Sequence, residues 1–358
     1  MTGSLLLRPA LSKALVLAAV LALAVPGTAY ANTLSVTVRT PGATSGPASA
    51  NSEISTHADC SSGLVSGGGI NQAVGTGSSV NGNHVNGTAP SSDGTTEYTG
   101  STGVVGTDVT HWLGIGGSGG QVNASFSTTP YAVCFTSNLI NHTQVVMNKA
   151  NAPTSGSTAG LVTATCPANT RLLGGGARTT PGNTGSLKTI ASFPTFNDSA
   201  HAFGAKAAAG GETNPDSWTA VGWDSGANSA DSTYAYALCS GSGINVSGVT
   251  VKVRHTEVSG PTTGSTGQTA TVGCGQGDGS LVSGGAAISG GSVTTTSFTG
   301  PGSGGDHLNG SFPSTSGGAA VTDGTTTAAY WTASAHTGGQ SSPGTSTDSW
   351  ALCADDGV

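Results

Sequence analysis

Short segments that alternate apolar and polar residues recur along the chain, and this pattern predicts β-strands. In Val249 to Arg254 and in Thr163 to Cys166, the two kinds of residue fall on opposite faces of an extended chain. Gly-Gly clusters and Asn-Gly pairs, such as Asn86-Gly87 and Asn309-Gly310, separate these segments and are typical of hairpin turns. The pattern therefore predicts an all-β protein built from many short strands.

One set of landmarks returns three times in the same order, which indicates an internal repeat. Each copy has an alternating segment, a Cys followed by a Gly-rich segment, a Trp, and a closing aromatic-led strand that ends in Cys. The Trp residues are Trp112, Trp218 and Trp331, and the closing strands begin at Tyr131, Tyr236 and Trp350. We expect three homologous antiparallel β units of about 105 residues each, over 32–140, 141–245 and 246–358. They would form one β-prism-like body or lie as tandem small sandwiches.

The Gly clusters inside the repeat stand at matching positions, so they indicate a structural requirement. Gly67 to Gly69 and Gly174 to Gly176 follow the first Cys of units one and two, and Gly284 and Gly285 stand at the same place in unit three. Gly in a strand often allows another backbone or an aromatic ring to approach closely, and we expect that role here. Because aromatic residues are few, we expect the repeated Trp and Tyr side chains to anchor the core.

The chain contains six Cys, and the repeat selects one of the fifteen ways to pair them. The expected disulfides join the two Cys of each unit: Cys60–Cys134, Cys166–Cys239 and Cys274–Cys353. A metal site would need Cys or His at short spacing, and neither CxxC nor HxxxH occurs. We therefore expect one disulfide per unit, assign no metal ligand and no cofactor, and leave calcium binding open.

The segment 1–31 has the features of a secretory signal peptide. Arg8 and Lys13 give it a positive start, an apolar run extends from Ala14 to Val25, and Ala29 to Ala31 form a small-x-small cleavage site. A membrane span needs about 20 apolar residues, which is more than this run provides. We expect cleavage after Ala31 and a secreted, extracellular product with no membrane span in its mature form.

Composition and charge narrow the classes of partner. Gly accounts for 59 of the 358 residues, and only 8% of residues are charged. The Gly content argues against helices, because each Gly costs about 1 kcal/mol in a helix interior. Ten Lys and Arg against 17 Asp and Glu cannot form a basic stripe, so nucleic acid and anionic lipid are poor partners. A weakly charged surface rich in Ser, Thr, Asn and Gly suits hydrogen bonding to glycans.

The motifs of the repeat are best preserved in unit two: Cys166-Pro167, Gly174 to Gly176, Ser192 to Pro194, Trp218-Thr219 and Tyr236 to Cys239. In this pattern the repeats resemble a family of uncharacterised exported actinobacterial proteins. Unit one departs from it at Ser61, and unit three has Gly275 after its first Cys and Trp350 in place of Tyr. The resemblance implies secretion and β-structure and carries no catalytic residue. A looser similarity to the β-prism of vitelline membrane outer layer proteins implies three β repeats, although the units here are much longer.

The most distinctive polar motif is His-[Val/Leu]-Asn-Gly. It occurs with His84 and Asn86 in unit one and with His307 and Asn309 in unit three, and it is absent from unit two. It predicts either a hairpin turn in which Asn-Gly adopts positive φ or a ligand-contacting loop that is presented twice.

The densest acid-aromatic patch extends from Asp216 to Trp223. Trp223 would stack on a sugar ring while Asp224 bonds its hydroxyls, or the patch is a core Trp beside a turn.

Catalytic patterns are weak. Gly116 to Gly120 fits G-x-S-x-G around Ser118, but the residues that follow do not begin the helix that a nucleophile elbow needs. The segment around His57 and Asp59 faintly resembles trypsin-like proteases, yet its place in the repeat accounts for it without catalysis. A glycosidase needs two opposed carboxylates, and no Asp or Glu recurs in all three units. We therefore assign no catalytic residue.

The sequence favours a secreted non-enzymatic binding protein that engages glycans or cell-wall polymers through repeated weak sites. The alternatives are a structural or envelope-surface protein that self-associates without a small ligand and, less favoured, a secreted hydrolase.

Overall fold

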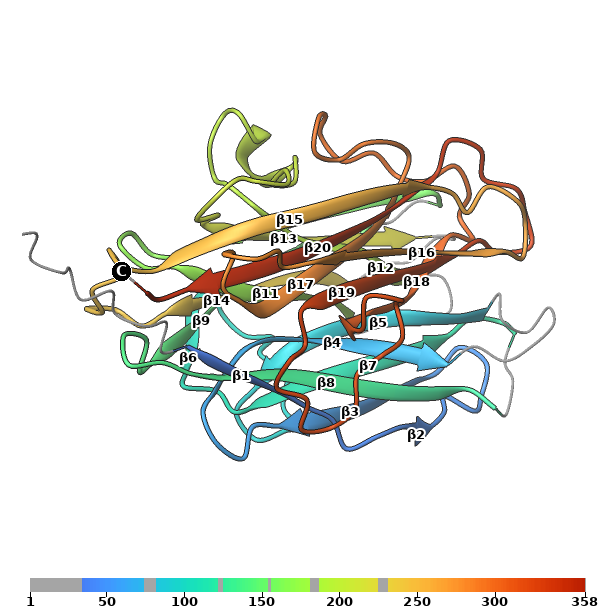
Figure 1. The fold of residues 1–358 in the computed structure, drawn as a ribbon. Coiled ribbons are helices and arrows are strands. Elements are labelled where there is room, and N and C mark those ends of the chain that lie inside the picture. Colours follow the sequence, from blue (N-terminus) through green and yellow to red (C-terminus); the bar gives the residue numbers. More distant parts are fainter. Residues whose placement is uncertain are drawn as a thin grey trace, which may run out of the picture.

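The computed structural model describes residues 34–73, 82–121, 125–153, 156–180, 187–224 and 231–357. The signal peptide expected over 1–31 lies outside these residues. Within them the chain forms three antiparallel sheets and little other regular structure (Figure 1). The prediction of an all-β protein with three antiparallel β units is confirmed.

Each sheet takes its strands from two units. Sheet I joins units one and three, in the order β1 (Ser35–Arg39), β8 (Ser127–Thr136), β4 (Leu64–Ala73), β18 (His307–Ser314), β19 (Tyr330–His336) and β16 (Gly267–Gly273), with β2 (Thr44–Ser45) paired to β8. Sheet II joins units one and two, in the order β3 (Glu53–Asp59), β7 (His111–Ser118), β5 (Asn83–Ser91), β11 (Leu172–Thr180), β14 (Ser232–Ser240), β9 (Thr143–Asn151) and β6 (Gly103–Thr107). Sheet III joins units two and three, in the order β10 (Thr158–Thr165), β13 (Ser217–Asp224), β12 (Leu187–Thr195), β17 (Ser280–Ser289), β20 (Ser346–Asp355) and β15 (Thr250–Ser259).

The junctions between units close a ring. In each sheet the Gly-rich strand of one unit pairs with the Ser-x-Pro-type strand of another, through Ile70–Ser311, Ala177–Thr88 and Ala286–Ser192. The main hydrophobic core contains side chains from all three sheets, including Ile70, Leu172 and Ile190. The three units therefore form one three-sided body, here called the prism, and tandem sandwiches are excluded.

Three disulfides staple the corners of the prism. They are Cys60–Cys134, Cys166–Cys239 and Cys274–Cys353, with sequence separations of 74, 73 and 79 residues, so the predicted pairing is confirmed. The first Cys of each pair follows β3, β10 or β16, and the second lies in β8, β14 or β20 of a neighbouring sheet. Each bridge therefore ties two sheets together within one unit.

The Gly clusters make room for Trp rings and for neighbouring backbone, as predicted. A Cβ atom on Gly68 would lie 2.5 Å from the Trp112 ring, and one on Gly175 would lie 2.3 Å from the Trp218 ring. The next residue in each cluster faces a backbone carbonyl of the adjoining unit instead: a Cβ on Gly69 would lie 2.1 Å from Ser311 O. The Trp side chains are fully buried, so their predicted role as core anchors is confirmed.

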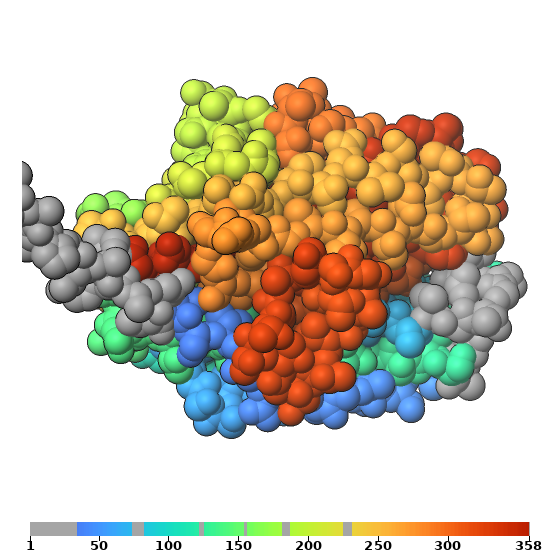
Figure 2. Space-filling view, in the orientation of Figure 1, coloured from blue at the N-terminus to red at the C-terminus, as the bar shows by residue number. Residues whose placement is uncertain are grey.

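In each unit, the connection that precedes the strand with the repeated Trp (β7, β13 or β19) covers the first strand of another unit. β6 pairs with β9, Thr213 forms a bridge with Lys252 of β15, and Thr325 forms a bridge with Val38 of β1. Figure 2 shows the last of these, the orange-red segment that follows β18, lying over unit one. These segments protect sheet edges that would otherwise expose unpaired backbone groups.

Because neighbouring strands run in opposite directions, equivalent strands of the three units begin at the same end of the prism, and its two ends therefore differ. The disulfides lie at the end where β4, β11 and β17 begin, here called the base, which also holds the C-terminus (Figure 1). The opposite end, where β5, β12 and β18 begin, is here called the apex. The three units therefore bring equivalent strand starts together at the apex.

Candidate functional site

Three equivalent residues, one from each unit, line a cavity at the apex. They are His84 of β5, Lys188 of β12 and His307 of β18, and each stands at the same offset before a β-bulge in its strand. The cavity has a volume of about 290 Å³, and its other lining residues are Gly82, Gly119, Gly120, Gln121, Gly305, Gly338 and Gly339. The ring centroids of His84 and His307 lie 6.4 Å apart. The two copies of the His motif therefore form one site and not two separate loops.

Backbone carbonyls fix the tautomers of these imidazoles. His307 Nδ1 lies 2.7 Å from Gly305 O, and His84 Nδ1 lies 3.0 Å from Gly82 O. A carbonyl only accepts hydrogen bonds, so both Nδ1 atoms carry a proton, and Nε2 presents a lone pair wherever the imidazole is neutral. His307 is 1% exposed, and its Nε2 has no hydrogen-bond partner among the described residues.

Burial keeps His307 neutral. It lowers the pKa of this imidazole well below 6.5, and the nearby Lys188 ammonium lowers it further. His336, whose ring centroid lies 5.5 Å from that of His307, donates from Nδ1 to Thr337 O, and burial lowers its pKa as well. The apex therefore holds a neutral acceptor, His307 Nε2, at ordinary pH.

Lys188 contributes a buried cation to the same cavity. Its side chain is only 6% exposed, and Nζ donates to Gly304 O at 2.9 Å. Burial lowers the pKa of Lys188 to about 8, against the opposing effect of the Asp306 and Asp224 carboxylates. Burial also raises the pKa of Asp306, whose Oδ1 has no hydrogen-bond partner in the described part of the chain. Lys188 is thus a buried donor whose positive charge is stabilised by the Asp306 and Asp224 carboxylates.

Asn86 and Asn309, for which the sequence predicted a hairpin turn or a ligand-contacting loop, do not line the cavity. Both lie inside strands at the bulge positions, not in hairpin turns, and both are buried. Asn86 Nδ2 donates to Glu53 Oε2 at 2.8 Å, and Asn309 Nδ2 donates to Asn83 O at 2.6 Å. Gly87, in turn, leaves space for Arg178, because a Cβ there would lie 2.6 Å from Arg178 Cδ.

Trp223 and Asp224 do not form an exposed sugar platform, which corrects the second prediction. Trp223 is 2% exposed, its Nε1 donates to Gly304 O at 3.2 Å, and a Cβ on Gly300 would lie 2.3 Å from its ring. Asp224 is fully buried, and its carboxylate acts on Lys188 by raising the pKa of that ammonium. The segment containing Gly300 and Gly304 covers the indole, so the ring packs in the core.

Sequence reasoning missed Lys188, because unit two lacks the His motif. A signal was present, since Ser192-Phe193-Pro194 aligns with Ser311-Phe312-Pro313 and counting back from either places Lys188 opposite His307.

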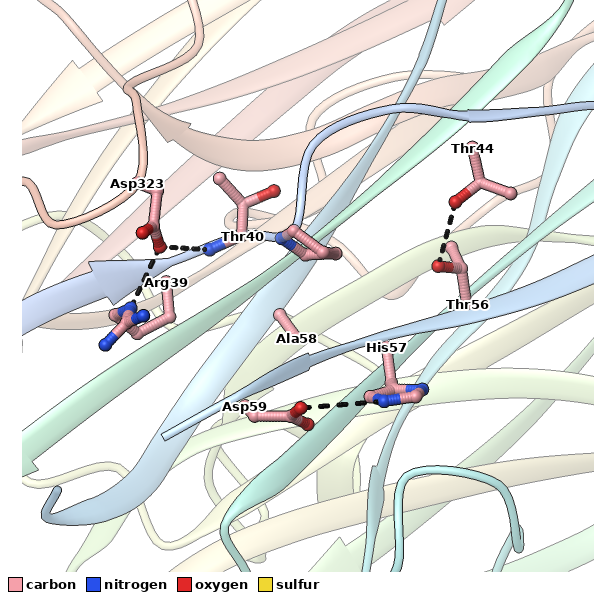
Figure 3. Close-up of a pocket in the computed structure, with 9 residues that line it drawn as sticks. Arg39, Thr40, Thr44, Thr56, His57, Ala58, Asp59 and Asp323 are labelled. Atoms are coloured by element: carbon pink, nitrogen blue, oxygen red, sulfur yellow. Dashed lines mark hydrogen bonds and ion pairs between the residues drawn. The ribbon is translucent and has the colours of Figure 1, made fainter. Parts of the chain in front are cut away.

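A second cavity lies at a corner of unit one (Figure 3). Arg39 pairs with Asp323 at 2.9 Å, and the Thr40 N–H donates to the same carboxylate, so these contacts hold the pKa of Asp323 below its usual value. His57 lies 3.6 Å from Asp59, and both side chains are substantially exposed. No serine lines this cavity within the described residues. Ser118, the serine of the G-x-S-x-G match, is fully buried and donates to Ser49 O.

Across the described ranges, no group of three His, Cys, Asp or Glu side chains is arranged to hold a metal ion. No helix in those ranges has the length and apolar character needed to cross a lipid bilayer. Comparisons with models of known protein families and with curated proteins return no match for this chain.

Proposed function

We propose that the protein is a secreted, non-enzymatic binding protein whose apex cavity holds a sugar unit of a neutral glycan or cell-wall polymer. The observation that carries this proposal is His307 Nε2, a buried acceptor without a partner among the described residues, in a side chain that lines the cavity. Leaving such a group unsatisfied costs about 1–3 kcal/mol, which a ligand hydroxyl would offset.

A sugar hydroxyl matches the polar groups of the cavity. It can donate one hydrogen bond and accept others, so it can bridge a lone pair on His307 Nε2 and the Lys188 ammonium. Gly119, Gly120 and Gly338 give much of the wall no side chains, which lets a ring approach the backbone. A volume of about 290 Å³ suits one sugar unit better than a long polymer segment.

The electrostatics favour a neutral ligand. The Lys188 charge faces the Asp306 and Asp224 carboxylates, and the neutral imidazole presents a lone pair that would repel an anion. We therefore propose hydroxyl recognition and not capture of a phosphate or carboxylate. The proposal also replaces two weak loop sites with one site to which all three units contribute.

The disulfides support an extracellular setting. Three structural bridges persist in oxidising compartments, where glycans and cell-wall polymers are also exposed. The signal peptide expected over 1–31 would deliver the chain there. The segments that cover β1, β9 and β15 count against an envelope component that assembles by adding strands at those particular edges.

Calorimetric titration of the secreted protein with neutral oligosaccharides, together with retention on purified cell-wall polysaccharide, tests the proposal. His307→Phe removes the acceptor while filling its space, and we expect at least about a tenfold loss of affinity. His307→Gln can place an amide oxygen where Nε2 stands and should retain most of the affinity.

His142→Phe is the matched control, because His142 is partly exposed beside Asp108 near the base. It should bind like the wild type. If no glycan or cell-wall polymer is retained, or if His307→Phe binds as the wild type does, the proposal is wrong.

A further inference from the structure

The connection between β12 and β13 presents an exposed aromatic ring. Phe203 lies in the short 3-10 helix η2 (Ala202–Gly204) and is 66% exposed, more than any other large hydrophobic side chain in the described part of the chain. Figure 2 shows this connection as the yellow-green lobe that stands out from the body of the prism. A single exposed apolar side chain is common on protein surfaces, so the question is whether its surroundings give this ring a role.

The backbone holds Phe203 in a strained conformation. Ala202 and Phe203 have φ values of 49° and 52°, and Gly204 follows with 97°, so three successive residues are left-handed. Such a conformation is unfavourable for L-residues and persists only where the surroundings enforce it.

Hydrogen bonds enforce this turn. The Phe203 N–H donates to Asp198 O at 2.7 Å, and Thr219 Oγ1 donates to Gly204 O at 2.7 Å. His201 lies 2.9 Å from Asp198 and 3.2 Å from Glu212 through its two ring nitrogens. The ring is therefore presented by a rigid support and not by a loose loop.

A polar cavity lies beside the ring. It has a volume of about 530 Å³ and runs between β9 and β10. Its lining includes Phe203 and the polar residues Asn148, Lys149, Thr163, Thr165 and Asn197. Amides, hydroxyls and one ammonium offer both donors and acceptors there. Cavities that bind small organic ligands have volumes of about 300–1,000 Å³.

The contacts favour a sugar chain over a peptide strand. β10 is an edge strand of sheet III, to which a peptide could in principle add. However, Asn148 Nδ2 already donates to Thr163 O at 2.8 Å and occupies an acceptor that an added strand would need. A pyranose needs no strand ladder, because its hydroxyls bond side chains and its apolar face packs on an aromatic ring.

We propose that this cavity, here called the Phe203 groove, binds an extended neutral polysaccharide with one sugar ring packed on Phe203. The site belongs to unit two alone and lies on the side of the prism, away from the apex. It does not depend on the apex site.

Calorimetric titration of the secreted protein with cellohexaose, chitohexaose and mannohexaose tests this inference, with an extended Thr-Val peptide as competitor. Phe203→Ala should weaken binding of at least one hexasaccharide by about tenfold. Phe203→Trp keeps an aromatic face and should bind at least as tightly as the wild type. Val104→Ala removes another exposed apolar side chain, on β6, and should change nothing.

His307→Phe separates the two sites. A hexasaccharide-binding step that survives His307→Phe and is lost with Phe203→Ala supports the groove, whatever the outcome at the apex. If no hexasaccharide binds, if every observed binding step is insensitive to Phe203→Ala, or if only the peptide binds in a Phe203-dependent way, the inference is overturned. Circular dichroism of each variant confirms that the fold is retained.

Discussion

The two ends of the prism use the same repeat in opposite ways. At the base, the three units place identical residues at equivalent positions, and each closes a disulfide. At the apex, equivalent positions carry His84, Lys188 and His307, and these side chains meet in one cavity. At the base the three units carry the same residue, because each needs a disulfide. At the apex they carry different residues, because a binding site needs different chemical groups side by side.

The comparison separates stability from recognition. At the base every Cys is paired in a disulfide, whereas the apex holds a buried cation and a buried acceptor that has no partner among the described residues. Polar groups held at such a cost are typical of binding sites. Variants at the base should therefore alter unfolding, and variants at the apex should alter binding.

The largest effect is expected at the base. Replacing Cys166 and Cys239 together by Ala opens a loop with a sequence separation of 73 residues. This should lower the free energy of unfolding by about 4 kcal/mol, because the unfolded chain gains conformational entropy. Urea unfolding measures the loss. Under native conditions the folded fraction should keep its affinity for the apex ligand; a parallel loss of affinity would show that the two ends are coupled.

The second-largest effect comes from comparing the same Gly-to-Ala change at a core position and at an apex position. Gly175→Ala would bring a Cβ to 2.3 Å from Trp218 and 2.4 Å from Tyr236 O, so we expect a destabilisation of about 3 kcal/mol. Gly120→Ala is the control, since nothing lies within 4 Å of its Cβ. It should leave the melting temperature unchanged. Equal effects in the two variants would contradict the close packing of the Gly clusters.

The third effect is a pH dependence that arises at the apex. The pKa of His307 is lowered in the folded state, so below pH 6.5 the unfolded chain binds the proton that the folded chain resists. The His307 contribution is fully present above pH 6.5 and is lost as the pH falls, with a slope of up to about 1.4 kcal/mol per pH unit. His336 adds in the same direction. His307→Phe should flatten the acid limb of the stability curve, and an unchanged curve would refute the assignment.

Ligand affinity should fall in both acid and base, and the acid loss should lie at lower pH than the loss of stability, because binding follows the lowered pKa of folded His307. Protonation of His307 removes the acceptor, and above the Lys188 pKa of about 8 the charged donor is lost. Titration calorimetry across this range should therefore give a maximum near neutral pH.

The smallest effect concerns the strained turn of unit two. Phe203→Gly relieves a left-handed residue and should raise the free energy of unfolding by about 0.5–1 kcal/mol, after allowance for the entropy of Gly in the unfolded chain. Urea unfolding checks the sign. A destabilised Phe203→Gly variant would show that the ring supports the fold and is not held there for a ligand.

Local patterns made much of the fold predictable. Cys166 and Cys239 could be paired because the repeat places them alike in every unit. The matched Gly clusters predicted the close approach of a backbone or an aromatic ring, and at Gly175 that ring is Trp218. The closure of the sheets could not be read in this way. Ser311 pairs with Ile70 of another unit, and nothing in a repeat tells whether a strand pairs within its own copy or with the next.

The apex was predictable only in part. The His motif was visible, but Asn-Gly does not distinguish a hairpin from a bulge inside a strand, so the turn predicted for Asn86-Gly87 was wrong. Trp223 is covered by a segment distant in sequence, around Gly300, which no local pattern reveals. Lys188 is the only Lys at its position in the repeat, since units one and three have His there, and only the fold shows that it shares a cavity with those two imidazoles.

The most direct test of the apex site is the ¹⁵N resonance of His307 Nε2 during titration with a neutral oligosaccharide. We predict that the free protein shows an unprotonated Nε2 at neutral pH. This resonance should shift upfield on binding, as a nitrogen does when it accepts a hydrogen bond, with the same saturation as the calorimetric isotherm. A resonance that stays unchanged while the oligosaccharide binds, or a protein that binds none, would contradict the account.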